Sequence, residues 1–133
     1  MADLRYGFER RLASTTFDQA VEKVTASLKK EGFGVLTEID VRDTLKKKLG
    51  VDFPRYVILG ACNPTLAHRA LGAEPHIGLL LPCNVVVQEA PGGGAVVSIA
   101  DPRAMFTLVD NAALVPVANE ADERLRRVIA SLE

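Results

Sequence analysis

The sequence predicts an α+β fold, in which a mainly antiparallel sheet is backed by helices. Five segments have the alternation or the β-branched content of strands, and two long segments have apolar residues at helical spacing. The last two strand-like segments are joined by the glycine-rich stretch 91–94, and so short a connection makes an antiparallel hairpin. A parallel sheet would need a long crossover between each pair of strands, so we expect an antiparallel or mixed sheet.

The first strand and the first long helix are predicted in the N-terminal part of the chain. Apolar and charged side chains alternate from Leu4 to Leu12, as in a strand with one buried face. Thr16 and Gln19 then have the spacing of a capping box, and Gly32 suits the exit of the helix that they open. The buried stripe of this helix consists of Phe17, Val21, Val24 and Leu28.

A second strand, a short helix and a third strand follow. The second strand is predicted from Phe33 to Ile39, and Asp40 is placed to cap a short helix that stops at Gly50. In the third strand, Arg55 to Cys62, both alternating sets of residues are apolar. We therefore expect both of its faces to be covered, the second face either by the segment 63–82 or by another subunit.

The remaining elements complete the sheet and its helices. Asn63-Pro64 and Asp101-Pro102 are signals for the start of short helices. The hairpin strands are predicted over 84–89 and 95–100, and Asn119 is placed to cap a final long helix. The apolar face of that helix consists of Leu125, Val128, Ile129 and Leu132.

Composition and charge exclude several broad classes of protein. The 133 residues, of which 48% are hydrophobic and 25% charged, match a single folded domain over residues 1–133. Because 16 Lys and Arg face 17 Asp and Glu, the formal charge of −1 gives no global field that attracts nucleic acid. The apolar runs are far shorter than the ~20 residues of a membrane span, and no signal-peptide pattern is visible. We expect a cytoplasmic protein that binds neither nucleic acid nor membrane.

Two similar tetrads are the most distinctive local feature: Ala61-Cys62-Asn63-Pro64 and Pro82-Cys83-Asn84-Val85. Each tetrad places Cys-Asn at the boundary of a predicted strand, where functional sites gather. Cys62 precedes a helix N-cap, where the helix dipole favours a thiolate, but it can equally be the last inward residue of a buried strand. Cys83 follows three leucines and a proline, a context that favours burial.

Metal binding and other kinds of catalysis have weaker support. Cys62, His68, His76 and Cys83 are separated by five, seven and six residues, unlike the close pairs of dedicated zinc sites. His68 falls on the polar side of its predicted helix, which favours a surface imidazole. No serine has the context of a nucleophile elbow, and the glycine-rich loop lacks the Lys-Ser/Thr of a phosphate loop.

A family resemblance is visible in four stretches of the chain. Two of them surround the Cys-Asn motifs, Gly60–Pro64 and Gly78–Val87, and two lie upstream, Gly32–Val41 and Thr44–Gly50. Over about Phe17 to Pro102 the chain resembles the bacterial and archaeal family called domain of unknown function 302. The resemblance implies a TATA-binding-protein-like α+β fold of the order β-α-β4-α, with a curved five-stranded sheet, two long helices and short inserted helices. It implies no activity, because the family has none established and a shared fold does not imply DNA binding.

We expect a module that binds a small ligand or a metal ion beside the two Cys-Asn motifs and that forms a homo-oligomer. The third strand offers the apolar walls, and the motifs offer the few polar groups, of a typical pocket. Two alternatives stay open: a structural or protein-interaction module with buried cysteines, and a thiol-dependent enzyme or redox carrier that uses Cys62 with Cys83 as resolving partner. The candidate binding residues are Cys62, Asn63, Cys83, Asn84 and His68.

Overall fold

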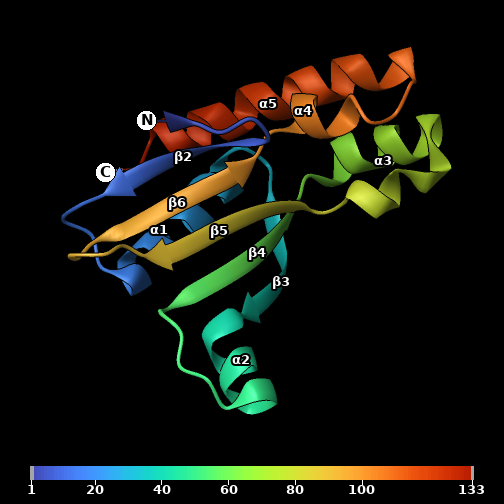
Figure 1. The fold of residues 1–133 in the computed structure, drawn as a ribbon. Helices are drawn as coiled ribbons and strands as arrows, with labels where there is room; N and C mark the ends of the chain where they lie inside the picture. Colours follow the sequence, from blue (N-terminus) through green and yellow to red (C-terminus); the bar gives the residue numbers. More distant parts are fainter. Residues whose placement is uncertain (1, 133) are drawn as a thin grey trace.

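One antiparallel sheet organises the chain, and the structure, a computed structural model, describes residues 2–132 (Figure 1). The strands are β1 (Ala2–Asp3), β2 (Gly7–Leu12), β3 (Gly34–Asp40), β4 (Tyr56–Cys62), β5 (Cys83–Glu89) and β6 (Ala95–Ala100). Their order in the sheet is β1-β2-β6-β5-β4-β3, and each neighbouring pair runs antiparallel. The antiparallel pairing that the hairpin predicts is therefore confirmed.

Helices of two lengths accompany the sheet. They are α1 (Phe17–Lys30), α2 (Val41–Leu49), α3 (Pro64–Ala73), α4 (Pro102–Phe106) and α5 (Val115–Ala130), with 3-10 turns η1 (Pro75–Leu80) and η2 (Ala112–Leu114). The two long helices, α1 and α5, contact each other and lie on the same face of the sheet. The order of the long elements is β-α-β4-α, as predicted, and the two-residue strand β1 is an addition to it.

The first long strand is shorter than predicted, because β2 begins at Gly7 and not at Leu4. The chain bends before it, with the Leu4 N–H donating to the Gly7 carbonyl at 2.6 Å. Leu4 and Tyr6, which the alternation assigns to the buried side, are 39% and 67% exposed. Gly7 permits close strand contact, since a Cβ at this position would lie 2.7 Å from the carbonyl oxygen of Ile99. The alternation of apolar and charged residues therefore begins before the first residue of β2, in a segment that is not part of this strand.

The final helix is longer than predicted, because α5 begins at Val115 and not at Asn119. Pro116 lies in its first turn, where no backbone N–H is needed for the helical hydrogen bonds, so the proline opens the helix. Asn119 does not act as the N-cap, and its side-chain oxygen accepts from Arg103 Nε at 3.0 Å. The added turn buries Val117 and Ala118.

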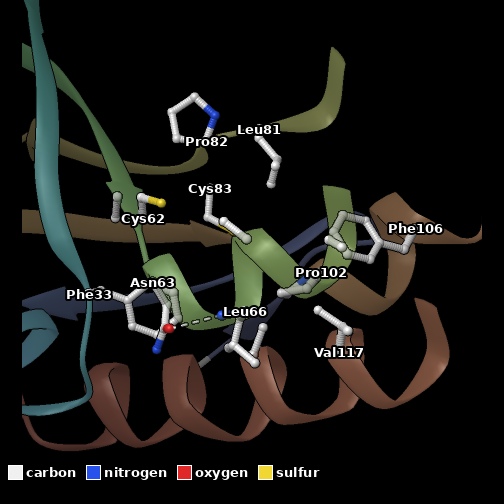
Figure 2. A pocket seen from close by; sticks show the side chains of 14 residues that line it. Phe33, Cys62, Asn63, Leu66, Leu81, Pro82, Cys83, Pro102, Phe106 and Val117 are labelled. Atoms are coloured by element: carbon white, nitrogen blue, oxygen red, sulfur yellow. Dashed lines mark hydrogen bonds between the residues drawn. The ribbon is translucent and has the colours of Figure 1, made fainter. Parts of the chain in front are cut away.

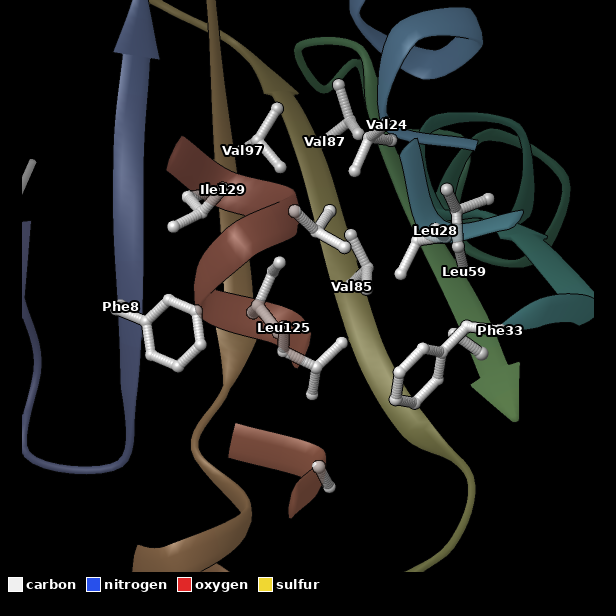
Figure 3. Packing of buried hydrophobic residues seen from close by; sticks show 14 of the residues in the cluster. Phe8, Val24, Leu28, Phe33, Leu59, Val85, Val87, Val97, Leu125 and Ile129 are labelled. Atoms are coloured by element: carbon white, nitrogen blue, oxygen red, sulfur yellow. The ribbon is translucent and has the colours of Figure 1, made fainter. Parts of the chain in front are cut away.

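The buried core lies between the sheet and the two long helices (Figure 3). One row of side chains crosses four strands and is at most 1% exposed: Phe8, Ile99, Val85 and Leu59. The helices contribute fully buried side chains to the same cluster: Val24 and Leu28 from α1, and Leu125 and Ile129 from α5. Burial of one such side chain contributes ~1.5–3 kcal/mol to stability.

The opposite face of the sheet has no helix over it in the described part of the chain (Figure 1). In β4, Leu59 and Ala61 point toward the helices and are buried, whereas Tyr56 and Ile58 point the other way and are half-buried. Of the two covers considered for this second face, the segment 63–82 covers only one end of it: a Cβ at Gly60 would lie 2.8 Å from Pro82 Cγ, whereas α3 packs against α5 and η2.

The packing of the core predicts a large loss of stability when one buried side chain of α1 is truncated. Leu28→Ala should lower the free energy of unfolding by about 2–5 kcal/mol, because it removes buried methyl groups and leaves a cavity beneath α1. Urea unfolding measures this loss. Leu79→Ala is the control: Leu79 is 86% exposed, and we expect a change of about 0.5 kcal/mol or less. Equal losses for the two variants would contradict the burial of Leu28.

Candidate functional site

The two Cys-Asn motifs meet at one end of the central strands. β4 ends at Cys62 and β5 begins at Cys83, and the antiparallel register places Cys83 opposite Ala61. The segment between the two strands, which contains α3 and η1, leaves the sheet at this end and returns to it. The antiparallel pairing of β4 and β5 therefore brings together two motifs that the sequence separates.

Two small cavities adjoin this end of the sheet, and we call them together the cysteine pocket. The first has a volume of about 30 Å³, enough for one or two water molecules. Its walls include Cys62, Asn63, Cys83, Phe33 and Leu66, which Figure 2 shows around the hollow. The second has a volume of about 140 Å³. The two cavities share the lining residues Leu81, Pro82, Cys83, Pro102 and Phe106.

Asn63 positions the start of α3 beside the cysteine pocket. Its side-chain oxygen accepts from the Leu66 N–H at 3.1 Å, and Pro64 occupies the first turn, as the helix-start signal predicts. On the neighbouring segment, a Cβ at Gly32 would lie 3.0 Å from Asn63 Nδ2, so the glycine leaves room for the amide. Asn84 lines the second cavity only and is exposed.

The two cysteines are free thiols, and each is half-buried. The register places Ala61 opposite Cys83, so Cys62 is offset from Cys83 by one residue. Adjacent residues of a strand point to opposite faces, and a one-residue offset therefore disfavours a cross-strand disulfide. Both thiols still reach the cysteine pocket, because the pocket wraps around the end of the sheet.

Burial raises the pKa of the Cys83 thiol to about 11, and the neighbouring Cys62 adds to the shift. A thiol with this pKa stays protonated at neutral pH, whereas attack on a disulfide or coordination of a metal requires the thiolate. Cys83 at neutral pH is therefore a small apolar group in the wall of the cysteine pocket.

The histidines do not join the cysteines. His68 lies on the exposed side of α3 and His76 is exposed in η1, and neither lines the cysteine pocket. Within residues 2–132, no three His, Cys, Asp or Glu side chains gather as a metal-binding cluster. A four-ligand site made of Cys62, His68, His76 and Cys83 is therefore not formed.

A buried carboxylate supports the far wall of the cysteine pocket, and sequence reasoning missed it. Asp122 on α5 is 1% exposed and pairs with Arg126 at 3.1 Å and with Arg103 of α4 at 3.3 Å. Burial raises the pKa of Asp122, while the two arginines act in the opposite direction. The i, i+4 spacing of Asp122 and Arg126 was the available sequence signal. The Arg103–Asp122 pair links α4, which carries Pro102 and Phe106, to α5, and Arg126 of α5 also pairs with Asp101, the N-cap of α4, at 3.6 Å.

The fold and the pocket define the class of protein: an open-faced α+β protein with one antiparallel sheet and helices on one side. The chain belongs to the family described as Domain of unknown function DUF302, whose sequence model matches residues 8–132, and the resemblance is thereby confirmed.

The crystal structure of an uncharacterised conserved DUF302 protein from Bacillus stearothermophilus is similar to this chain. The two share 32% sequence identity over 94% of this chain and 96% of that chain, with a TM-score of 0.85. No curated protein matches the sequence. Across residues 2–132, none of the helices combines the length and the apolar character that crossing a bilayer requires.

The raised pKa of Cys83 predicts slow alkylation. At pH 8 a thiol with a pKa of about 11 has about a hundredfold less thiolate than one at 9.0, so Cys83 should react about a hundredfold more slowly than in the unfolded chain. Its rate should rise with pH through about 11. Site-resolved mass spectrometry after timed alkylation measures this, with protein in urea as control. Equal rates in folded and unfolded protein would contradict the assignment.

Proposed function

We propose that this protein is a module that binds a small ligand in the cysteine pocket. The observation that supports the proposal is the convergence of Cys62, Asn63 and Cys83 on one apolar cavity at the ends of β4 and β5, with Asn84 lining the adjoining cavity. Ligand sites in proteins commonly combine apolar walls with a few polar groups of this kind. The proposed binding residues are Cys62, Asn63, Cys83 and Asn84. His68 has no place in this site, because it does not line either cavity.

The size and chemistry of the pocket limit the ligand. Volumes of about 30 and 140 Å³ are below the ~300 Å³ at which typical metabolite pockets begin, so the ligand is compact and largely apolar. Alternatively, two thiols can hold a soft metal ion such as Cu⁺, which prefers thiolate ligands. A metal ion would have to displace the proton that Cys83 keeps at neutral pH.

A structural module is the second candidate, and the raised pKa of Cys83 favours it. In that case the cysteines only pack, and the protein acts through its surfaces. The third candidate, a thiol-dependent enzyme or redox carrier using Cys62, has less support, because its proposed resolving partner Cys83 is protonated at neutral pH and the register disfavours a disulfide. We further propose a cytoplasmic, self-associating single domain over residues 1–133 that does not bind nucleic acid.

Filling the cysteine pocket should abolish binding. Ala67 lines the first cavity from α3, so Ala67→Met places a longer side chain in the space that a ligand would occupy. Leu71→Met, one turn further along the same helix and outside the pocket, is the matched control. The measurement is the thermal shift produced by a panel of compact apolar metabolites, Zn²⁺ and Cu⁺. A compound at about 100 times its Kd should stabilise the wild-type protein and Leu71→Met by about 2.7 kcal/mol.

The same compound should not stabilise Ala67→Met. Two outcomes would contradict the proposal: no shift of the wild-type protein by any member of the panel, or a shift that Ala67→Met retains in full. The unfolding midpoint of each variant without ligand shows whether the substitution has itself disturbed the fold.

A further inference from the structure

The face of the sheet opposite the helices has an unusual composition. The register aligns one row of side chains across it from β3 to β2: Ile39, Ile58, Val86, Ser98 and Glu9. A second row lies beside the first, from β4 to β2: Tyr56, Gln88, Val96 and Arg11. We call these two rows the open face. An antiparallel sheet with one solvated face normally carries polar residues there, but half of this face is apolar.

The apolar half of the open face is accessible and extends beyond the strands. Ile39 is 49% exposed, and Ile58, Val86 and Val96 are half-buried. Phe53 continues the surface, with its ring centroid 6.1 Å from that of Tyr56. Contiguous exposed apolar surface of this kind marks an interaction site.

We propose that the open face binds the open face of a second copy of this chain, so that two sheets pack into a sandwich. A symmetric dimer requires a surface that is complementary to itself. The open face meets this condition: β2 contributes one anion, Glu9, and one cation, Arg11, two residues apart on the same side. A two-fold axis can place Glu9 of each copy near Arg11 of the other, while the apolar halves bury each other.

The charge of the open face disfavours nucleic acid as the partner. Arg11 is the only cation among the nine residues of the two rows. Its Nη2 donates to the carbonyls of Pro91 and Gly93 at 3.2 Å, and the other guanidinium nitrogens can still donate to Glu9 of a second copy. Binding to a phosphate backbone draws on several Lys and Arg side chains, which this face lacks.

The dimensions of the open face define the kind of dimer. Two rows of side chains take up about 14 Å along five strands that lie about 4.8 Å apart, which gives a flat footprint on the order of 300 Å². The side chains that project from the sheet, and Phe53, make the accessible area larger than this flat footprint. The area still falls below the roughly 800 Å² per partner that a standard interface buries. We therefore expect a dimer that dissociates on dilution, with monomers that stay folded because their core lies on the other face.

Sedimentation equilibrium of the full chain from roughly micromolar to roughly millimolar concentration tests the proposal. The wild-type protein should change from monomer to dimer across this range. Ile58→Lys and Val86→Lys place a charge at the centre of the open face, and each should raise the dissociation constant about tenfold or more. Val115→Lys is the control, because Val115 is 55% exposed on α5, on the helix side of the sheet, and it should leave the constant unchanged.

A charge exchange tests the two-fold arrangement separately. Glu9→Arg and Arg11→Glu each create like charges across the axis and should weaken the dimer, whereas the double variant restores opposite charges and should recover it. Circular dichroism confirms that each variant is folded. The proposal is overturned by a wild-type protein that is monomeric at every concentration, or by a dimer that survives both lysine substitutions. None of these variants touches the cysteine pocket, so the outcome is independent of the proposed ligand binding.

Discussion

The rest of the structure depends on the register of the antiparallel sheet. Because side chains alternate with a period of two, fixing Phe8 opposite Ile99, and Leu59 opposite Val85, sends all four toward the helices. The same register sends their neighbours Glu9, Ser98, Val86 and Ile58 to the other face. A slip by one residue would exchange the two sets and expose the core. The burial of one row under α1 and α5 therefore also determines what the open face presents.

The cysteine pocket arises where this alternation ends. At the last residues of β4 the chain turns into α3, capped by Asn63, and the returning segment enters β5 at Cys83. The side chains here are no longer covered by a regular neighbour, and small cavities remain between β4, β5, α3 and α4. The ion pair of Asp122 with Arg103 links α4 to α5, so a buried charge on α5 supports one wall of the pocket. The two surfaces are thus separate: the pocket at one end of the sheet, and the open face across its middle.

Local signals in the sequence predicted most of the elements, and distant contacts account for what they missed. Thr16 and Gln19 predicted the start of α1, where both bonds of the capping box are present, and the glycine-rich loop predicted the hairpin of β5 and β6. The start of β2 and the start of α5 were wrong, because a bend at residues 4–6 and a helix-opening Pro116 leave the apolar pattern unchanged. Neither Cys-Asn motif, taken alone, predicted that the two motifs lie next to each other in the fold. Phe33, Pro102 and Phe106, which complete the pocket, come from other elements and carry no local signal.

The central claim is that the two faces of the sheet have separate roles, one closed by helices and one that binds a second copy. Hydroxyl-radical footprinting at low and at high protein concentration tests it most directly, because the chain has two tyrosines in different settings. Tyr56 lies on the open face, and Tyr6 lies in the exposed bend before β2. We predict that concentration lowers the oxidation of Tyr56, together with Ile58 and Val86, while Tyr6 reacts equally in both samples. A constant ratio of Tyr56 to Tyr6 oxidation would contradict the claim.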